Sequence, residues 1–106
     1  MDRDEIYKQD ILNAISKIEK YADGVEYEAF LKDEMMQDAI SRQLGIIGEA
    51  AKGLSNDFKL AYPQIPWKDI TGTRDILIHD YTKVKQEIVW TTIIDSLPKL
   101  KSALEK

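Results

Sequence analysis

Hydrophobic positions near the start of the chain recur every three or four residues, which is the period of an α-helix. Lysines and acidic residues occupy the opposite face of this pattern. The pattern predicts an amphipathic helix from Asp2 to Ala22, with Asp23 and Gly24 after it. A glycine at that place can adopt the left-handed conformation that closes a helix. The apolar face is expected to consist of Tyr7, Ile11, Ala14, Ile15, Ile18, Tyr21 and Ala22.

A second long helix is predicted after residues 25–31, which leave room for at most a short turn of helix. Asp33 is a good N-cap, and Glu34 suits the positive end of the helix dipole. Gly45 and Gly48 each cost about 1 kcal/mol relative to alanine in a helix, so the pair indicates a close approach of another backbone. That neighbour is either a helix of the same chain or the equivalent helix of a second copy. The predicted apolar face contains Met36, Ala39, Ile40, Gln43, Leu44, Ile47, Ala50, Ala51 and Leu54.

Prolines divide the second half of the chain. Two prolines within residues 62–66 predict a loop, and Pro66 is suited to the first turn of a following helix. A short linker at 82–85 should lead to a last helix from about Gln86, and Pro98 should kink or restart that helix. Its apolar positions are Ile88, Val89, Ile93, Ile94, Leu97, Leu100 and Leu104.

Four main helices with short connections predict an all-α fold, an antiparallel helical bundle in which residues 1–106 form a single domain. The sequence has no internal repeat and no strand pattern. It contains no cysteine, which excludes disulfides and thiolate metal sites, and no apolar run long enough for a membrane span. These features predict a cytoplasmic protein with no membrane partner.

The formal net charge of −4 argues against broad, charge-driven binding of nucleic acid. Any contact with RNA must therefore be local. Lys68, Lys83 and Lys85 flank the chain's only histidine, His79, and they can supply a positive rim there.

The helix predicted for residues 67–81 carries an arginine on its apolar stripe. The stripe consists of Trp67, Ile70, Arg74, Leu77 and Tyr81 at helical spacing. Because an unpaired buried charge is costly, Arg74 must either extend to water or meet an anion. Glu49 in the preceding long helix is a candidate partner for Arg74, and the alternative is that Glu49 is simply solvated.

His79 lies about 140° around a regular helix from Arg74. The two side chains can still converge on one ligand if the helix ends near His79, or if a second copy supplies the missing half. The second option implies a homodimer. An arginine that holds phosphate oxygens and an imidazole that titrates near neutral pH together suit attack of a ribose 2′-hydroxyl on its own phosphodiester. DNA lacks that hydroxyl, so the substrate would be RNA and not DNA.

The pattern R-x-x-x-x-H-x-Y, formed by Arg74, His79 and Tyr81, resembles the signature of the HEPN superfamily, and in particular of HepT toxins. Similar proteins also carry I-G-E-A, I-P-W and L-P-x-L runs in this order. Here these are residues 47–50, 65–67 and 97–100, so the resemblance covers most of the chain from Arg42 to Leu100. One departure is Asp75, where such proteins often have asparagine. This keeps a polar group after the arginine and adds a charge.

The resemblance implies a HEPN-like helical bundle that acts as a homodimer and as the toxin of a toxin–antitoxin system. It implies a metal-independent endoribonuclease with Arg74 and His79 as catalytic residues and Asp75 and Glu49 as supporting residues. It also implies a partner, a minimal nucleotidyltransferase antitoxin, which transfers AMP from ATP onto Tyr81. A phenol-linked nucleotide would place charge and bulk where an RNA phosphate must dock. No cofactor or metal is expected.

Other interpretations of the same residues remain open. Arg74 can extend to water, His79 can be a surface or capping residue, and Tyr81 can be packed in the core. A non-catalytic nucleotide- or protein-binding module, or a structural helical adaptor, would then be the function. No other catalytic motif is visible, since the chain has no glycine-rich phosphate loop, no H-E-x-x-H and no serine or cysteine in a nucleophile motif.

Overall fold

The computed structural model describes residues 2–72 and 83–105, and the side chains of residues 83–85 lie outside this description. The predicted site residues Arg74, Asp75, His79 and Tyr81 therefore lie outside the described residues. Within the described part the chain is helical and contains no strand, which confirms the all-α prediction.

The first helix begins and ends where its capping residues predict. Helix α1 spans Arg3–Ala22, and the carboxylate of its N-cap, Asp2, accepts a hydrogen bond from the backbone N–H of Asp4 at 3.3 Å. After α1, Gly24 has φ of +70°, the left-handed conformation that glycine adopts at little cost. The predicted helix and its glycine terminator are both confirmed.

The second predicted helix is also confirmed. A short helix, α2 (Tyr27–Leu31), precedes α3 (Glu34–Gly53), and the side chain of Asp33 accepts a hydrogen bond from the N–H of Met36 at 3.0 Å. Buried residues of α3 recur on one face and belong to the predicted set, with the addition of Gly48. They are Ile40, Gln43, Leu44, Ile47, Gly48, Ala50 and Ala51.

A short helix that was not predicted follows α3. Helix α4 spans Asn56–Leu60, and Ser55 caps it by accepting the N–H of Phe58 at its hydroxyl oxygen. The carboxylate of Asp4 in turn accepts the N–H of Ser55 at 2.8 Å and its hydroxyl at 2.6 Å. The start of α1 is thereby tied to the start of α4. The serine at 55 was the available signal for this helix.

The chain then passes through the predicted loop and forms a helical segment at 67–72. The N–H of Ile70 bonds to the carbonyl of Pro66 at 3.1 Å, so Pro66 stands at the start of this helix as predicted. Trp67 is half-buried and Ile70 is buried, as their places on the predicted stripe require.

The last part of the chain departs from a regular helix. Helix α6 (Lys83–Thr91) begins three residues before the predicted start, so Lys83 and Lys85 are helical and not part of a linker. A π-helical turn, η1 (Thr92–Ser96), follows, and then α7 (Leu97–Leu104) with Pro98 in its first turn. Pro98 has no N–H to continue the ladder, so the predicted restart of the helix is confirmed.

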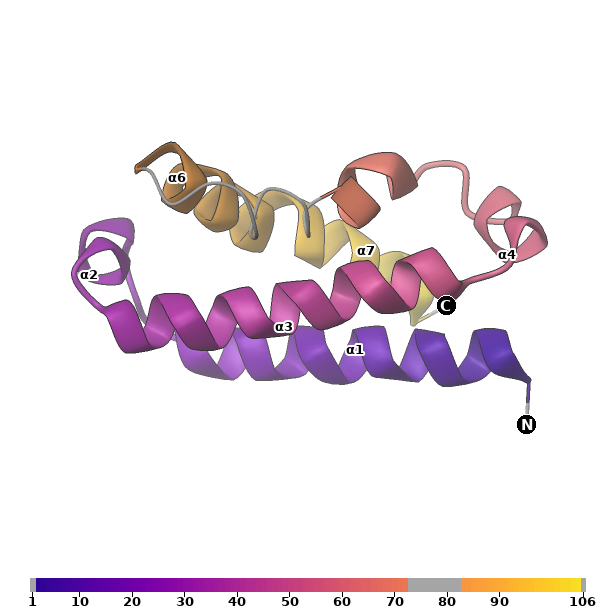
Figure 1. Ribbon diagram of the computed structural model, residues 1–106, viewed down its shortest axis with the longest axis horizontal. Coiled ribbons are helices and arrows are strands. Elements are labelled where there is room, and N and C mark those ends of the chain that lie inside the picture. The colour runs from indigo at the N-terminus through magenta and orange to yellow at the C-terminus, as the bar shows by residue number, and fades with distance from the viewer. Residues whose placement is uncertain (1, 73–82, 106) are drawn as a thin grey trace.

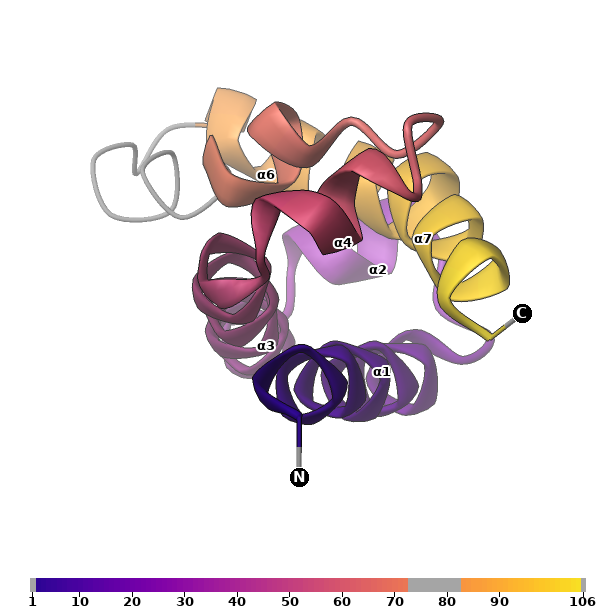
Figure 2. The ribbon, with the colours of Figure 1, turned by 90° about the vertical axis from the view of Figure 1, so that its right-hand side faces the viewer.

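The helices run back and forth around one core. In Figure 1, α1 and α3 lie side by side, and α6 and α7 cross above them from the end where α2 lies to the other end. Figure 2 shows α1, α3, α6 and α7 arranged around a common centre. Within the described residues this is the antiparallel bundle that was predicted. Its largest fully buried side chains are Phe30, Ile11, Ile15, Ile18, Ile40, Leu44, Leu100, Leu104 and Val89.

Two predicted apolar-face residues are exposed instead. Tyr21 is 36% exposed in the last turn of α1, and Ile94 is 55% exposed in η1. Val89, Leu97 and Leu100 are buried, so the wide π-turn keeps these residues facing the core while Ile94 faces outward.

Of the two glycines predicted to allow a close approach, Gly45 has no close neighbour and Gly48 stays a prediction, whereas a third glycine of α3 does have a close neighbour. A Cβ atom added at Gly45 would meet nothing within 4 Å, so no described helix of the same chain packs closely there. A Cβ atom added at Gly53 would lie 2.6 Å from the Tyr7 ring. Gly53 is therefore the position at which α1 and α3 need a glycine, and the predicted homodimer stays a prediction.

Candidate functional site

The described structure borders the predicted motif on both sides, with the segment 67–72 before it and α6 after it. The indole N–H of Trp67 fixes the first of these borders by donating to the carbonyls of Lys59, at 3.1 Å, and Tyr62, at 3.2 Å. The ring of Phe58 packs edge-on against the indole, with centroids 6.4 Å apart. Helix α4 and the loop after it therefore hold the helix that leads into the motif.

Aromatic packing fixes the other border. Trp90 of α6 stacks at an angle on Phe30 and on Tyr27, with ring centroids 5.1 Å and 5.8 Å apart. Phe30 is completely buried. These contacts anchor α6, the helix that follows the motif in the sequence, on α2.

A polar network accompanies these rings. The Gln37 side-chain amide donates to the carbonyl of Phe30 at 2.8 Å, and its oxygen accepts from the Gln86 amide at 3.4 Å. The Tyr27 hydroxyl and the Gln86 amide oxygen are buried, with no hydrogen-bond partner among the described residues. Burial raises the pKa of the Tyr27 phenol, and the negative charge of Glu87 raises it further.

A pocket of about 410 Å³ lies between the segment 67–72 on one side and α6 and η1 on the other. Lys68, which was predicted as part of a positive rim, is exposed and lines this pocket. Thr92 and Ser96 of η1 also line it, and sequence reasoning did not single them out. Two hydroxyl residues four positions apart, just before Pro98, were the signal that could have identified them.

Glu49 is exposed on α3. It lines a groove of about 600 Å³ between α1 and α3 together with Arg42, Asp10 and Gly45. This groove is a separate place from the 410 Å³ pocket. The supporting role of Glu49 toward Arg74 stays a prediction.

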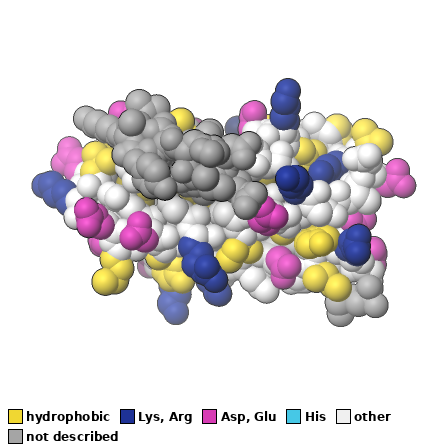
Figure 3. All heavy atoms as spheres, in the orientation of Figure 1, with side chains coloured by type: hydrophobic (Ala, Val, Ile, Leu, Met, Phe, Trp, Pro, Cys, Tyr) yellow, Lys and Arg dark blue, Asp and Glu magenta, His cyan; other side chains and the backbone are white. Residues whose placement is uncertain are grey.

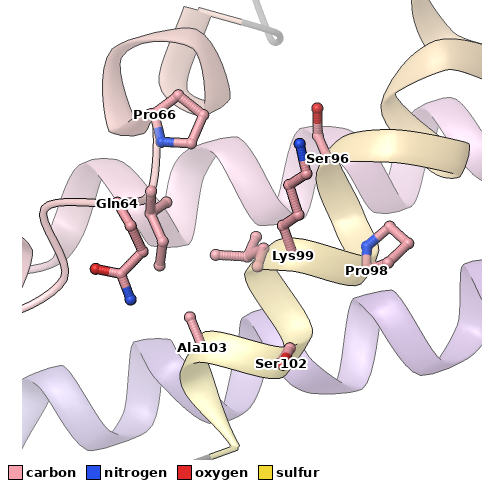
Figure 4. Close-up of a pocket in the computed structure, with 9 residues that line it drawn as sticks. Gln64, Pro66, Ser96, Pro98, Lys99, Ser102 and Ala103 are labelled. Carbon is pink, nitrogen blue, oxygen red and sulfur yellow. The ribbon is translucent and has the colours of Figure 1, made fainter.

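A third pocket, of about 450 Å³, lies between the loop at 62–66 and α7 (Figure 4). Gln64 and Pro66 stand on its loop side, and Lys99 and Ala103 of α7 stand opposite. On the face shown in Figure 3, basic and acidic side chains of the described residues are intermixed. An anionic ligand on that face would therefore be attracted by individual basic side chains and not by a broad positive surface, as the net charge of −4 led us to expect.

No group of three or more histidine, cysteine, aspartate or glutamate side chains in the described part of the chain is arranged to hold a metal ion. None of the described helices combines the length and the apolar character needed to cross a membrane.

Comparison with known proteins gives a consistent result. The family model described as "Ribonuclease HepT-like" matches residues 11–106. A protein of Thermococcus cleftensis named "Probable ribonuclease HepT" is 43% identical over 100 residues, which cover 94% of this chain and 91% of that protein. No solved structure matches.

Two further relatives carry the name "Putative RNase". One from Caldanaerobacter subterraneus subsp. tengcongensis is 37% identical, over 94% of this chain and 89% of its own length. One from Methanocaldococcus jannaschii is 34% identical, over 91% of this chain and 88% of its own length. With the family match across nearly the whole chain and an all-α bundle in the described residues, the chain belongs to the HepT-like ribonuclease family of the HEPN superfamily.

Proposed function

We propose that this protein is an endoribonuclease that cleaves RNA without a metal ion and acts as the toxin of a toxin–antitoxin pair in the cytoplasm. The observation that carries the proposal is the R-x-x-x-x-H-x-Y sequence at 74–81 within a chain of the HepT-like ribonuclease family. The names of the relatives agree with an RNA substrate.

In the proposed reaction the ribose 2′-oxygen attacks the adjacent phosphorus, and the bond from phosphorus to the 5′-oxygen breaks. His79 takes the proton of the 2′-hydroxyl or protonates the leaving 5′-oxygen, and Arg74 stabilises the negative charge on the pentavalent phosphate. The products are a 2′,3′-cyclic phosphate and a 5′-hydroxyl. Asp75 and Glu49 are proposed as supporting residues, and a second copy of the chain completes the site in a homodimer.

The test is cleavage of RNA by purified, unmodified protein in EDTA. Wild type should cleave and leave the cyclic phosphate, whereas His79→Ala and Arg74→Ala should each lose about 10² to 10⁴ in rate. Arg3→Ala is the matched control, because Arg3 is an exposed arginine in the first turn of α1. Loss of cleavage on chelation, or full activity of His79→Ala, would contradict the mechanism. Binding without cleavage would favour the non-catalytic module.

We further propose that the antitoxin, a minimal nucleotidyltransferase, inactivates the protein by modifying Tyr81. The phenol oxygen attacks the α-phosphorus of ATP, AMP is transferred to the tyrosine and pyrophosphate leaves. The Tyr81→Phe variant should stay toxic in cells that contain the antitoxin, because it keeps the ring and lacks the acceptor oxygen. Tyr21→Phe is the control, since Tyr21 is an exposed tyrosine on α1.

Mass spectrometry of the intact protein after incubation with the antitoxin and ATP shows whether AMP has been added, and fragmentation localises it. Labelling of a tyrosine other than Tyr81, or neutralisation of Tyr81→Phe as efficient as that of wild type, would reject this part of the proposal.

A further inference from the structure

The 410 Å³ pocket beside the motif combines apolar walls with polar groups at its edge. Pro66, Ile70 and Ile88 supply carbon surface from both sides, Thr92 and Ser96 supply hydroxyl groups, and Lys68 supplies a positive charge. A volume of this order suits a group of small-molecule size. An unstacked base needs an apolar surface for its face and hydrogen-bonding groups for its edge, and the neighbouring phosphate needs a cation. The pocket offers all three.

Two hydroxyl residues of the π-turn η1 line the same pocket. The N–H of Leu97 bonds to the carbonyl of Thr92, five residues before it, which widens the turn beyond that of an α-helix. Residues four apart lie on the same face of a helix. Thr92 and Ser96, which are four apart, thus both reach the pocket. π-turns are often found at functional sites.

Thr92 already has a fixed orientation. Its hydroxyl donates to the carbonyl of Ile88 at 2.8 Å, so the lone pairs of the oxygen remain available to accept a hydrogen bond. Such an acceptor suits an amino or imino N–H on the edge of a base. Asp69 also lines the pocket.

Covalent geometry ties the pocket to the motif. Gly72 lines the pocket, and the Cα atom of a residue two positions further along any chain lies within about 7 Å. That residue is Arg74. The pocket therefore adjoins the start of the motif along the chain. The pocket in Figure 4 lacks this link, because Pro66 is its lining residue nearest to Arg74 in the sequence.

We propose that the 410 Å³ pocket binds the nucleoside next to the scissile phosphate of a single-stranded RNA substrate, with Lys68 near the backbone phosphate of that nucleotide. This inference rests on the proposed ribonuclease function and adds the residues that select the substrate. If one nucleoside occupies the pocket, the protein should prefer a particular base on one side of the cut. Because the protein carries a net negative charge, its binding of RNA should depend on this local site.

Two substitutions test the pocket without touching the motif. Ile88→Glu replaces an apolar wall by a negative charge, and Lys68→Ala removes the cation. The matched controls are Ile6→Glu and Lys17→Ala, which make the same changes of charge at exposed positions of α1. The substrate is a set of RNA oligonucleotides in which the bases on either side of the cut are varied.

The expected result is a rise in KM of about tenfold or more for Ile88→Glu, in line with the measured contribution of one bound base. Its preference for one flanking base should be lost, while kcat changes little. Lys68→Ala should raise KM less and weaken the salt dependence of binding. The controls should match wild type. An unchanged KM and base preference in Ile88→Glu would overturn the proposal while leaving the ribonuclease function intact.

A second measurement separates failure of the pocket from failure of the catalytic proposal. An oligonucleotide with 2′-deoxyribose at every position cannot be cleaved by 2′-hydroxyl attack, so its binding is measured even if wild type shows no ribonuclease activity. Ile88→Glu should weaken this binding, and Thr92→Val provides a milder change if Ile88→Glu does not fold. Equal binding by wild type and the folded pocket variants would overturn the proposal. Loss of the antitoxin complex with unchanged RNA binding would assign the pocket to a protein and would equally overturn it.

Discussion

The contact between Gly53 and the Tyr7 ring makes a sharp prediction about packing. Both residues lie where the first turns of α1 cross the last turn of α3. A methyl group at position 53 would place its carbon 2.6 Å from two atoms of the Tyr7 ring and 3.0 Å from a third. Carbon atoms in ordinary contact are about 3.5–4.0 Å apart, so the ring must move by about 1 Å.

Two opposing effects set the size of the change in Gly53→Ala. Alanine is favoured over glycine in a helix by up to about 1 kcal/mol. Overpacking of a well-packed site costs about 1–3 kcal/mol. Because Tyr7 is half-buried and its ring must shift, we expect a net loss of about 1–2 kcal/mol in the free energy of unfolding. For a domain of this size the corresponding fall in Tm is about 5–10 °C.

The assay is thermal and denaturant unfolding of a double-mutant cycle. In the Tyr7→Ala background the ring is gone, so Gly53→Ala should become neutral or stabilising. The coupling between the two substitutions should therefore be about 1–3 kcal/mol. If Gly53→Ala has the same effect in both backgrounds, the Tyr7 ring is not what requires glycine at this position.

Gly45→Ala is the matched control on the same helix. Because the added carbon meets nothing within 4 Å, the helix preference should raise stability by up to about 1 kcal/mol. A loss of stability that depends on protein concentration would instead show that a second copy packs on Gly45.

Three further predictions concern the contacts that hold α1, α2 and α4. Hydrogen bonds from Ser55 lower the pKa of the Asp4 carboxyl below its ordinary value of 3.8. The stabilising effect of the Asp4 carboxylate is therefore present above its unfolded-state pKa and is lost as the pH falls through its folded-state pKa. The Tm difference between wild type and Asp4→Asn should shrink accordingly in acid. Ser55→Ala removes the α4 cap and should cost about 1 kcal/mol by urea unfolding, whereas Ser55→Thr should cost less. Phe30→Ala empties a fully buried site and should cost about 3–5 kcal/mol in the same assay, and a cost below 1 kcal/mol would contradict the packing described for α2 and α6.

Helical periodicity and capping residues predicted the long elements well. Asp2, Gly24 and Asp33 mark the ends of helices in the structure as they do in the sequence. These signals are local, since each depends on one side chain or one backbone angle. The start of α6 was misplaced because Lys83 and Lys85 carry no apolar signal, although lysine is a good helix former.

Signals that depend on tertiary contact were harder to interpret. Gly45 and Gly53 are both glycines of α3, and only the position of the Tyr7 ring distinguishes them. The pocket residues Thr92 and Ser96 lie in a π-turn, which the 3.6-residue period does not reveal. The proposed catalytic roles of Arg74 and His79 are supported by the R-x-x-x-x-H-x-Y pattern and by membership of the HepT-like family.

The two tryptophans of the chain occupy opposite ends of the bundle. Trp67 hydrogen-bonds to the chain around α4, and Trp90 packs against α2 (Figure 1). Indole fluorescence is sensitive to its surroundings, so each tryptophan is an intrinsic optical probe of its own end. Trp90→Phe would leave a single emitter at the entry to the motif, one residue before Lys68, and oligonucleotide binding could then be followed without an attached dye.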